Sequence, residues 1–276
     1  MQLTENIENR TFRKFFFIVT THWELLKELF KREVKEQFLG GYLGTVWLFF
    51  HPLFIMAVYI FVFQFVFKNK IGGTYQLPLD YTTYLLSGLI PWLNVQQVLS
   101  RSCVAITANA GLVKQVIFPI ELLPVKTILA TFPSQLVSMF VLLLYVLVTY
   151  KYLFLTYLML PALLLIQTIL AIGIAYILSS ITVFVRDIKE LINLFSFAGM
   201  FLLPIAYLPD WVPAQFKPLI YLNPFSYMIW CYQDVFYFGR IEHPSAWIVF
   251  TFFAIGVFMF GSYVFNAMKT HFGDAL

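Results

Sequence analysis

The sequence contains little charge, and long stretches of it contain none. Only 12% of the 276 residues are charged, about half of the roughly 25% that is typical of soluble domains, and 61% are hydrophobic. Six intervals of about 19 to 34 residues lack Asp, Glu, Lys and Arg: 37–67, 81–100, 127–150, 152–185, 191–209 and 243–268. A helix of roughly 20 apolar residues crosses a bilayer core. This pattern excludes a soluble protein and predicts an all-α integral membrane protein with six transmembrane helices.

Basic residues are scarce on one side of the six predicted spans. If the N-terminus is cytoplasmic, 13 Lys and Arg side chains fall on inner segments and five on outer segments, which accounts for all 18. Cytoplasmic loops of membrane proteins carry such an excess of Lys and Arg. The sequence therefore predicts a multi-pass protein with both termini in the cytoplasm.

A seventh charge-free interval, 218–233, is too short to span. It has 16 residues and contains Pro218 and Pro224, and the surrounding region 208–244 holds five of the 13 prolines and ten aromatic residues. We expect a re-entrant outer segment between spans five and six, because irregular backbone at membrane depth must be buried in protein or line a wet cavity. The alternative is an interfacial belt of aromatic residues.

The chain before the first span predicts an amphipathic helix on the cytoplasmic interface. Thr21 and Glu24 fit a capping box, and Trp23, Leu26 and Phe30 follow at helical spacing. Packing of this helix on a soluble partner is the alternative. The expected organisation is a cytoplasmic region 1–42, a six-span domain 43–267 and a tail 268–276, with a cytoplasmic loop 100–124 and an outer region 208–244.

Several kinds of chemistry are absent from the sequence. There is no G-x-x-x-x-G-K-[ST] nucleotide-binding loop, and the four histidines show no metal-ligand spacing. Span centres carry no acidic or basic residue of the kind that ion-coupled transporters place there. We therefore expect no catalytic residue, no metal, no cofactor of its own and no nucleic-acid partner. Polar span residues are expected to bond to neighbouring helices, and the two cysteines to be packing residues: Asn94, Gln135, Gln167 and Gln64, with Cys103 and Cys231.

Four groups of short motifs follow one another along the chain. They are REVK (32–35) with LGTVW (43–47) and Pro52; NAGLVK (109–114) with Phe118-Pro119 and Leu123-Pro124; FVRDI (184–188); and Leu203-Pro204 with YLNP (221–224). In this order they resemble the membrane subunit of type 2 ABC exporters, which move bacterial O-antigen, teichoic acid or capsule. The resemblance covers about residues 25–265. The chain departs from the family pattern at Ile120-Glu121, where a basic residue is frequent.

The resemblance implies partners and a substrate. A chain of this family would form a homodimer in the bacterial inner membrane, above two copies of a separate ATPase that binds ATP and Mg. It would translocate a lipid-linked (undecaprenyl diphosphate) glycan, with O-antigen favoured. Teichoic acid, capsule, or a small lipid or drug are the alternatives. A membrane-embedded transferase is disfavoured, because the outer carboxylates are scattered along the sequence.

The resemblance also implies three sets of site residues. One set would couple the chain to the ATPase: Asn109, Gly111, Leu112, Val113, Lys114 and Pro119, with Arg186 and Asp187. A second would line an aromatic substrate channel: Tyr42, Trp47, Phe50, Tyr59, Phe195, Phe197, Phe201 and Tyr207. A third would attract a lipid headgroup: Lys31, Arg32 and Lys35. The alternatives are ordinary positive-inside residues, aromatics that face lipid, and bases that attract bulk anionic lipid.

Overall fold

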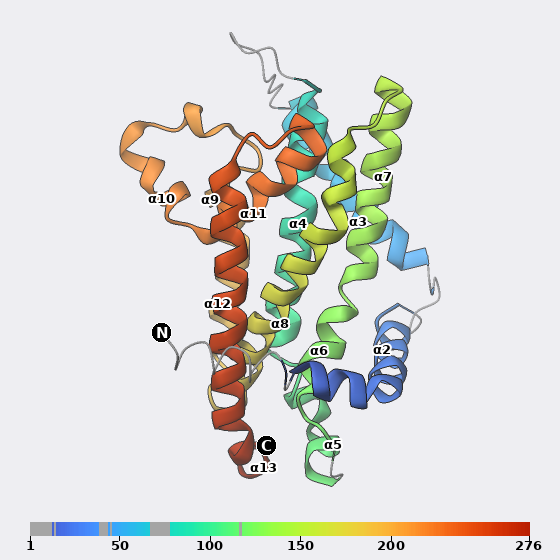
Figure 1. The fold of residues 1–276 in the computed structure, drawn as a ribbon, viewed down its shortest axis with the longest axis vertical. Coiled ribbons are helices and arrows are strands. Elements are labelled where there is room, and N and C mark those ends of the chain that lie inside the picture. Colours follow the sequence, from blue (N-terminus) through green and yellow to red (C-terminus); the bar gives the residue numbers. More distant parts are fainter. Residues whose placement is uncertain (1–12, 14, 39–43, 45, 67–77, 116–117) are drawn as a thin grey trace.

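The structure is a computed structural model that describes residues 13, 15–38, 44, 46–66, 78–115 and 118–276. Within these ranges every regular element is helical (Figure 1). The α-helices are α2 (Trp23–Phe38), α3 (Val46–Ile60), α4 (Tyr81–Ser102), α5 (Ala110–Gln115), α6 (Leu122–Leu129), α7 (Phe132–Tyr150), α8 (Leu160–Phe184), α9 (Ile188–Leu202), α10 (Lys217–Tyr221), α11 (Pro224–Gln233), α12 (Pro244–Met268) and α13 (Phe272–Ala275).

Among the residues that the structure describes, four helical segments are long and apolar enough to cross a membrane. They are Val46–Phe63, Leu122–Tyr150, Leu155–Phe184 and Pro244–His271. Val46–Phe63 and Leu155–Phe184 lie within charge-free intervals, and the other two segments overlap the intervals 127–150 and 243–268 but also include Lys126 and Lys269. A long stretch without charged side chains can be placed in hydrocarbon. The predicted all-helical, multi-pass membrane architecture is therefore confirmed.

The other two predicted spans, α4 and α9, differ from these four in polarity or length. α4 has 22 residues and lies in the middle of the bundle (Figure 1), where most of its side chains are buried by protein. It can therefore carry polar residues such as Thr82, Thr83 and Asn94. α9 has 15 residues, or about 22 Å at 1.5 Å per residue, which is shorter than a bilayer core of roughly 30 Å. The count of six spans stays a prediction.

The closest helix pair is α8 and α12, which run side by side along the bundle (Figure 1). The small residues Ala171, Ala175 and Ser179 of α8 are all buried, as their four-residue spacing predicts. A Cβ atom on Gly173 would lie 2.6 Å from the backbone of Phe258, and one on Gly261 would lie 2.3 Å from the Gly173 carbonyl oxygen. The two backbones therefore meet at glycine, where no side chain holds them apart.

The proline-rich region 208–244 folds at the end of the molecule where α12 begins (Figure 1). α11 is largely buried and packs against α4 and α12. The Asp234 carboxylate accepts hydrogen bonds from the backbone N–H of His243 at 3.1 Å and from Trp247 Nε1 at 3.0 Å, which fixes the start of α12. The re-entrant character of the region 208–244 stays a prediction.

Helix α2 lies towards the opposite end, beside α6 and near α5 (Figure 1). It begins at Trp23, but residues 15–21 before it are also helical, so Thr21 does not start the helix as the predicted capping box requires. Leu26 on its apolar face is buried, whereas Trp23 remains exposed. α2 is thus amphipathic, and part of its apolar face packs on the protein itself.

Candidate functional site

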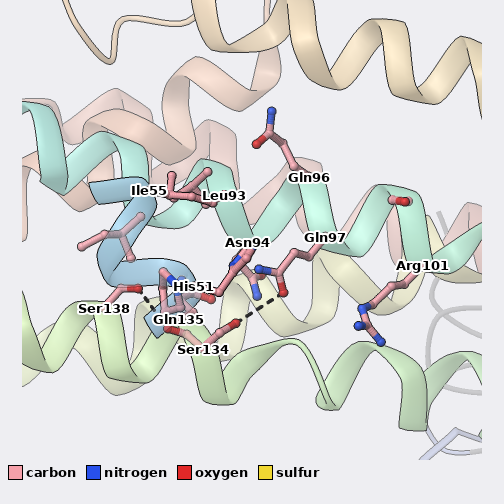
Figure 2. A pocket seen from close by; sticks show the side chains of 13 residues that line it. His51, Ile55, Leu93, Asn94, Gln96, Gln97, Arg101, Ser134, Gln135 and Ser138 are labelled. Atoms are coloured by element: carbon pink, nitrogen blue, oxygen red, sulfur yellow. Dashed lines mark hydrogen bonds between the residues drawn. The ribbon is translucent and has the colours of Figure 1, made fainter. Parts of the chain in front are cut away.

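A groove runs between α3, α4 and α7 and consists of three adjoining cavities of about 330, 270 and 320 Å³. The first two share five lining residues, and the second and third share three. The shared residues are His51, Pro52, Gln97, Arg101 and Ser134, and then Ile55, Leu93 and Gln96. We call this continuous hollow the α3–α4 groove; Figure 2 shows its middle part.

The walls of the α3–α4 groove come from residues spaced four apart on two helices. Trp47, His51, Ile55 and Tyr59 form one wall on α3. Leu93, Gln97 and Arg101 form the facing wall on α4. Residues four apart share one face of a helix, and the order of the lining residues shows that the two helices run antiparallel.

The polarity of the α3–α4 groove changes along its length. At the α2 end it is lined by Arg101, Gln97, Ser134, His51 and Gln37. At the other end the walls are Phe54, Ile55, Val58, Tyr59 and Leu93, with Gln96 the remaining polar residue. Figure 2 shows Arg101 on the stretch of α4 beyond Gln97 and Asn94, and Ile55 beside Leu93. The groove thus has a polar, cationic end and an apolar end.

A buried network of uncharged side chains lies behind the groove. Gln167 Nε2 donates to Asn94 Oδ1 at 2.9 Å, and Asn94 Nδ2 donates to Thr131 Oγ1 at 3.0 Å. Gln135 Nε2 and the Tyr232 hydroxyl both donate to Gln167 Oε1. The predicted role of Asn94, Gln135 and Gln167 in bonding neighbouring helices is confirmed, and the network joins α4, α7, α8 and α11. The side chain of Gln64 lies outside the described residues.

An ion-pair cluster connects the polar end of the groove with the cytoplasmic loop predicted at 100–124. Lys126 Nζ donates to Glu33 Oε2 at 2.7 Å and to Asn109 Oδ1 at 3.3 Å, and Lys126 is almost fully buried. Arg101 Nη1 lies 3.8 Å from the other oxygen of Glu33. Glu33 of α2 therefore lies between the groove and Asn109. We call Glu33, Lys126 and Asn109 the Glu33 cluster.

The expected ATPase-coupling residues lie at the far end of the molecule, on and around α5 (Figure 1). Gly111 and Lys114 are exposed, and Leu112 and Val113 are partly buried. Asn109 is partly buried, and its side-chain amide donates to the Ala105 carbonyl oxygen at 2.9 Å. The Pro119 carbonyl oxygen accepts from the Leu122 N–H at 3.0 Å. Gly111 and Lys114 are thus the residues most open to a docking partner.

The second expected coupling site lies beside the first. Arg186 and Asp187 are exposed in the turn between α8 and α9. A cavity of about 390 Å³ is lined by Arg186 together with Ala110 of α5 and the C-terminal Leu276. The structure therefore brings the two predicted coupling segments to one surface, although they are about 75 residues apart in the sequence.

Six of the eight expected channel aromatics fall on two helices, α3 and α9, which both pack against α4, and Tyr207 lies in the segment after α9. On α3, Trp47 and Phe50 are exposed, with ring centroids 5.6 Å apart. On α9, Phe195, Phe197 and Phe201 are exposed, and Phe195 also contacts Trp92 of α4. Tyr59 and Tyr207 are half-buried, and Tyr42 lies outside the described residues.

Two of the three expected headgroup residues are paired within α2. Lys31 Nζ and Arg32 Nε each lie 2.7 Å from a carboxylate oxygen, of Glu28 and Glu36 respectively. The hydrogen bond and charge of Glu28 raise the pKa of Lys31, and Glu36 likewise raises the pKa of Arg32. Both side chains stay charged, and Lys35 is exposed.

Glu33, Gln97, Arg101 and Lys126 were not among the expected site residues. In the sequence Arg101 and Lys126 contribute only to the positive-inside count. A signal was present: Leu93, Gln97 and Arg101 repeat every four residues, as do Trp47, His51 and Ile55. That spacing places each set on one helix face, but it does not reveal that the two faces oppose each other.

Comparison with known proteins places the chain in a family. Residues 24–237 match the model of the ABC-2 type transporter family. A Klebsiella pneumoniae protein named O-antigen export system permease protein RfbA is 26% identical over 255 residues, which cover 92% of this chain and 95% of the relative. A Myxococcus xanthus protein of the same name is 23% identical over 256 residues, which cover 91% of this chain and 95% of that relative. The resemblance to type 2 ABC exporters is thereby confirmed, and because the family model spans most of its length, the chain belongs to the ABC-2 type transporter family.

Proposed function

We propose that this chain is the permease subunit of an ATP-driven ABC exporter that moves a lipid-linked polysaccharide, with O-antigen as the cargo. The observation that carries the proposal is the alignment of O-antigen export permeases with 92% of the chain, within a matching family model. The alignment runs through the charge-poor helices and the cytoplasmic loop, so it concerns the whole architecture. The chain is proposed as a transport subunit and not as an enzyme.

The energy for uphill export would come from a separate subunit. The sequence contains no phosphate-binding loop of the P-loop type, so ATP and Mg would be bound by two copies of an ATPase. The exposed Gly111 and Lys114, with Arg186 and Asp187 on the same surface, support docking of that ATPase at α5. Closure of the ATPase pair would push on α5 and tilt the helices joined to it.

A homodimer would supply the rest of the path. The candidate span that contains α3 is only 11% buried, whereas the other three are between 33% and 50% buried. Trp47 and Phe50 of α3 are exposed, as are Phe197 and Phe201 of α9. Aromatic rings stack on the C–H faces of sugars without fixed hydrogen bonds, so a polysaccharide could slide between these rings of two copies. This arrangement supports a lumen between two copies.

The donor would enter from the cytoplasmic leaflet of the bacterial inner membrane. Lys31, Arg32 and Lys35 of α2 would attract the undecaprenyl diphosphate headgroup, as juxtamembrane bases attract anionic lipids. Of the three, the exposed Lys35 is the best candidate for a headgroup contact, because Lys31 and Arg32 already have carboxylate partners. Both termini would lie in the cytoplasm, on the side of α5.

The test is to purify the tagged full chain from its own host in mild detergent and to identify what accompanies it. We expect a P-loop ATPase to co-purify, and the reconstituted pair to move a lipid-linked glycan into inverted vesicles when ATP is added. Vesicles that receive a non-hydrolysable ATP analogue are the control. The proposal fails if no ATPase accompanies the chain and none stimulates glycan transport.

A further inference from the structure

We propose that the α3–α4 groove is a binding site for the phosphate headgroup of a membrane lipid, with Arg101 as the phosphate contact and the lipid tail on the apolar walls. Binding of a lipid phosphate is inferred from the groove alone. The narrower reading, that this lipid is the carrier of the exported glycan, rests on the proposed function.

The shape of the groove fits an amphiphile. Its three cavities are continuous, and their lining changes from Arg101, Gln97 and His51 at one end to Phe54, Val58 and Leu93 at the other. A fully polar ligand would leave its far end against hydrocarbon walls, and a fully apolar one would leave the remaining N–H groups of Arg101 and the amide nitrogen of Gln97 without partners. A molecule with a polar head and a hydrocarbon tail matches both ends.

The charge at the polar end favours an anion. Arg101 and Lys126 are two positive groups that share one carboxylate, Glu33, so these three side chains together carry a net charge of +1. Lys126 holds Glu33 at 2.7 Å, whereas the Arg101 distance of 3.8 Å is too long for a hydrogen bond. With the amide of Gln37 oriented to satisfy both of its atoms, its oxygen accepts one N–H of Arg101 at 3.0 Å.

The remaining donors of Arg101 suit phosphate. A guanidinium has five N–H donors in a planar fork that binds two phosphate oxygens at once, and only one of the five is engaged by Gln37. Gln97 Oε1 lies 3.3 Å from Ser134 Oγ, which leaves the Gln97 amide nitrogen available to a second acceptor. His51, exposed on the facing wall, offers a further ring nitrogen.

Arg101 also links the groove to the cytoplasmic loop. The same Glu33 that lies near Arg101 is bonded to Lys126, and Lys126 is bonded to Asn109 immediately before α5. A phosphate that engaged Arg101 would compete with Glu33 for it. Lipid binding in the groove would then alter the contacts of Glu33, Lys126 and Asn109 next to α5, the segment proposed to dock the ATPase.

Native mass spectrometry of the purified full-length chain, with its co-purifying partner where one is present, tests the site. Two lipids are titrated separately: undecaprenyl diphosphate and phosphatidylglycerol. We expect Arg101→Gln to weaken the binding of at least one of the two lipids by about tenfold or more, because a charge-assisted, two-point contact is lost. The affinity of Arg101→Lys should lie between those of the wild-type chain and Arg101→Gln. Arg240→Gln is the matched control, since Arg240 is exposed and paired with Glu242 at the other end of the molecule.

A second variant covers the case in which Arg101→Gln does not fold. Ile55→Trp fills the middle of the groove from α3, whose span is the least buried, and should weaken the same lipid while the chain remains intact. The proposal is overturned if Arg101→Gln and Ile55→Trp bind both lipids as the wild-type chain does. If the variants lose binding of undecaprenyl diphosphate alone, the ligand is the export carrier. If they lose binding of phosphatidylglycerol alone, the ligand is an ordinary membrane lipid.

The outcomes separate this site from the proposed function. If the variants bind both lipids normally and an ATPase still co-purifies and drives export, the groove proposal fails and the exporter stands. If lipid binding depends on Arg101 and no ATPase accompanies the chain, the groove stands and the exporter fails.

Discussion

At the scale of single residues, Gly173 shows how closely this bundle is packed. Its Cα faces the backbone of Phe258 so directly that a methyl group would lie 2.6 Å from two backbone atoms. Backbone cannot rotate away as a side chain can, so the helices themselves would have to separate. In a membrane, where helix association depends on close packing, the lost contact is not replaced by a hydrophobic driving force.

Gly173→Ala should therefore destabilise the protein, by about 1–3 kcal/mol if the helices shift as in other overpacked interiors. Gly256→Ala is the matched control on α12, because a Cβ there would meet no atom within 4 Å. We expect Gly256→Ala to be neutral or slightly stabilising, since alanine favours helix over glycine. Thermal unfolding of both variants in the same detergent measures the difference, and an unchanged midpoint for Gly173→Ala would contradict the packing argument.

At the scale of elements, the charge-free intervals predicted several helices closely and others less well. The interval 243–268 corresponds to α12 (Pro244–Met268), and 152–185 contains α8 (Leu160–Phe184). The interval 191–209 was expected to form the fifth span, but α9 covers Ile188–Leu202. Leu203 adopts an extended conformation before Pro204, as residues that precede proline prefer, and this ends α9 early.

The short helix α5 is the element whose proposed role is most directly testable. Ala110–Gln115 can be replaced by a Gly/Ser segment of equal length while Asn109 and its bond to Lys126 are retained. We expect export to be lost and ATP hydrolysis by the partner to become independent of the glycan, because a flexible segment cannot transmit the movement of the ATPase. The measurements are ATP hydrolysis and glycan transport in the same vesicles.

The matched control for α5 is a Gly/Ser replacement of Ala214–Phe216, a short exposed segment of the outer region. This replacement should leave the coupling between hydrolysis and transport intact. Unchanged export after replacement of α5 would remove α5 from the coupling mechanism.

At the scale of the whole molecule, the number of membrane crossings decides which face α5 occupies. Four spans satisfy length and composition, and the six-span prediction adds α4 and α9. Both native cysteines are free and buried, so a chain with Cys103→Ser and Cys231→Ser provides a background for single exposed cysteines. Tyr152, Gln215, Lys114 and Lys189 are suitable positions.

With six crossings, Tyr152→Cys and Gln215→Cys should react with a membrane-impermeant maleimide added to intact spheroplasts. Lys114→Cys and Lys189→Cys should react only after permeabilisation, in keeping with the positive-inside distribution. Reaction of Lys114→Cys from outside would mean that α4 does not cross and that α5 cannot meet a cytoplasmic ATPase.

The sequence by itself determined the helical membrane class, four candidate spans and the family. Each follows from local information. Long runs without charge specify helices that are stable in the bilayer core, and the order of short motifs along the chain indicates the family. The tertiary structure alone decided which polar residues face one another. Gln97 and Arg101 meet His51 across a groove, and Glu33 reaches Lys126 over 93 positions of sequence. Such contacts depend on how separate helices pack, and helical periodicity describes each helix without saying which neighbour its face will meet.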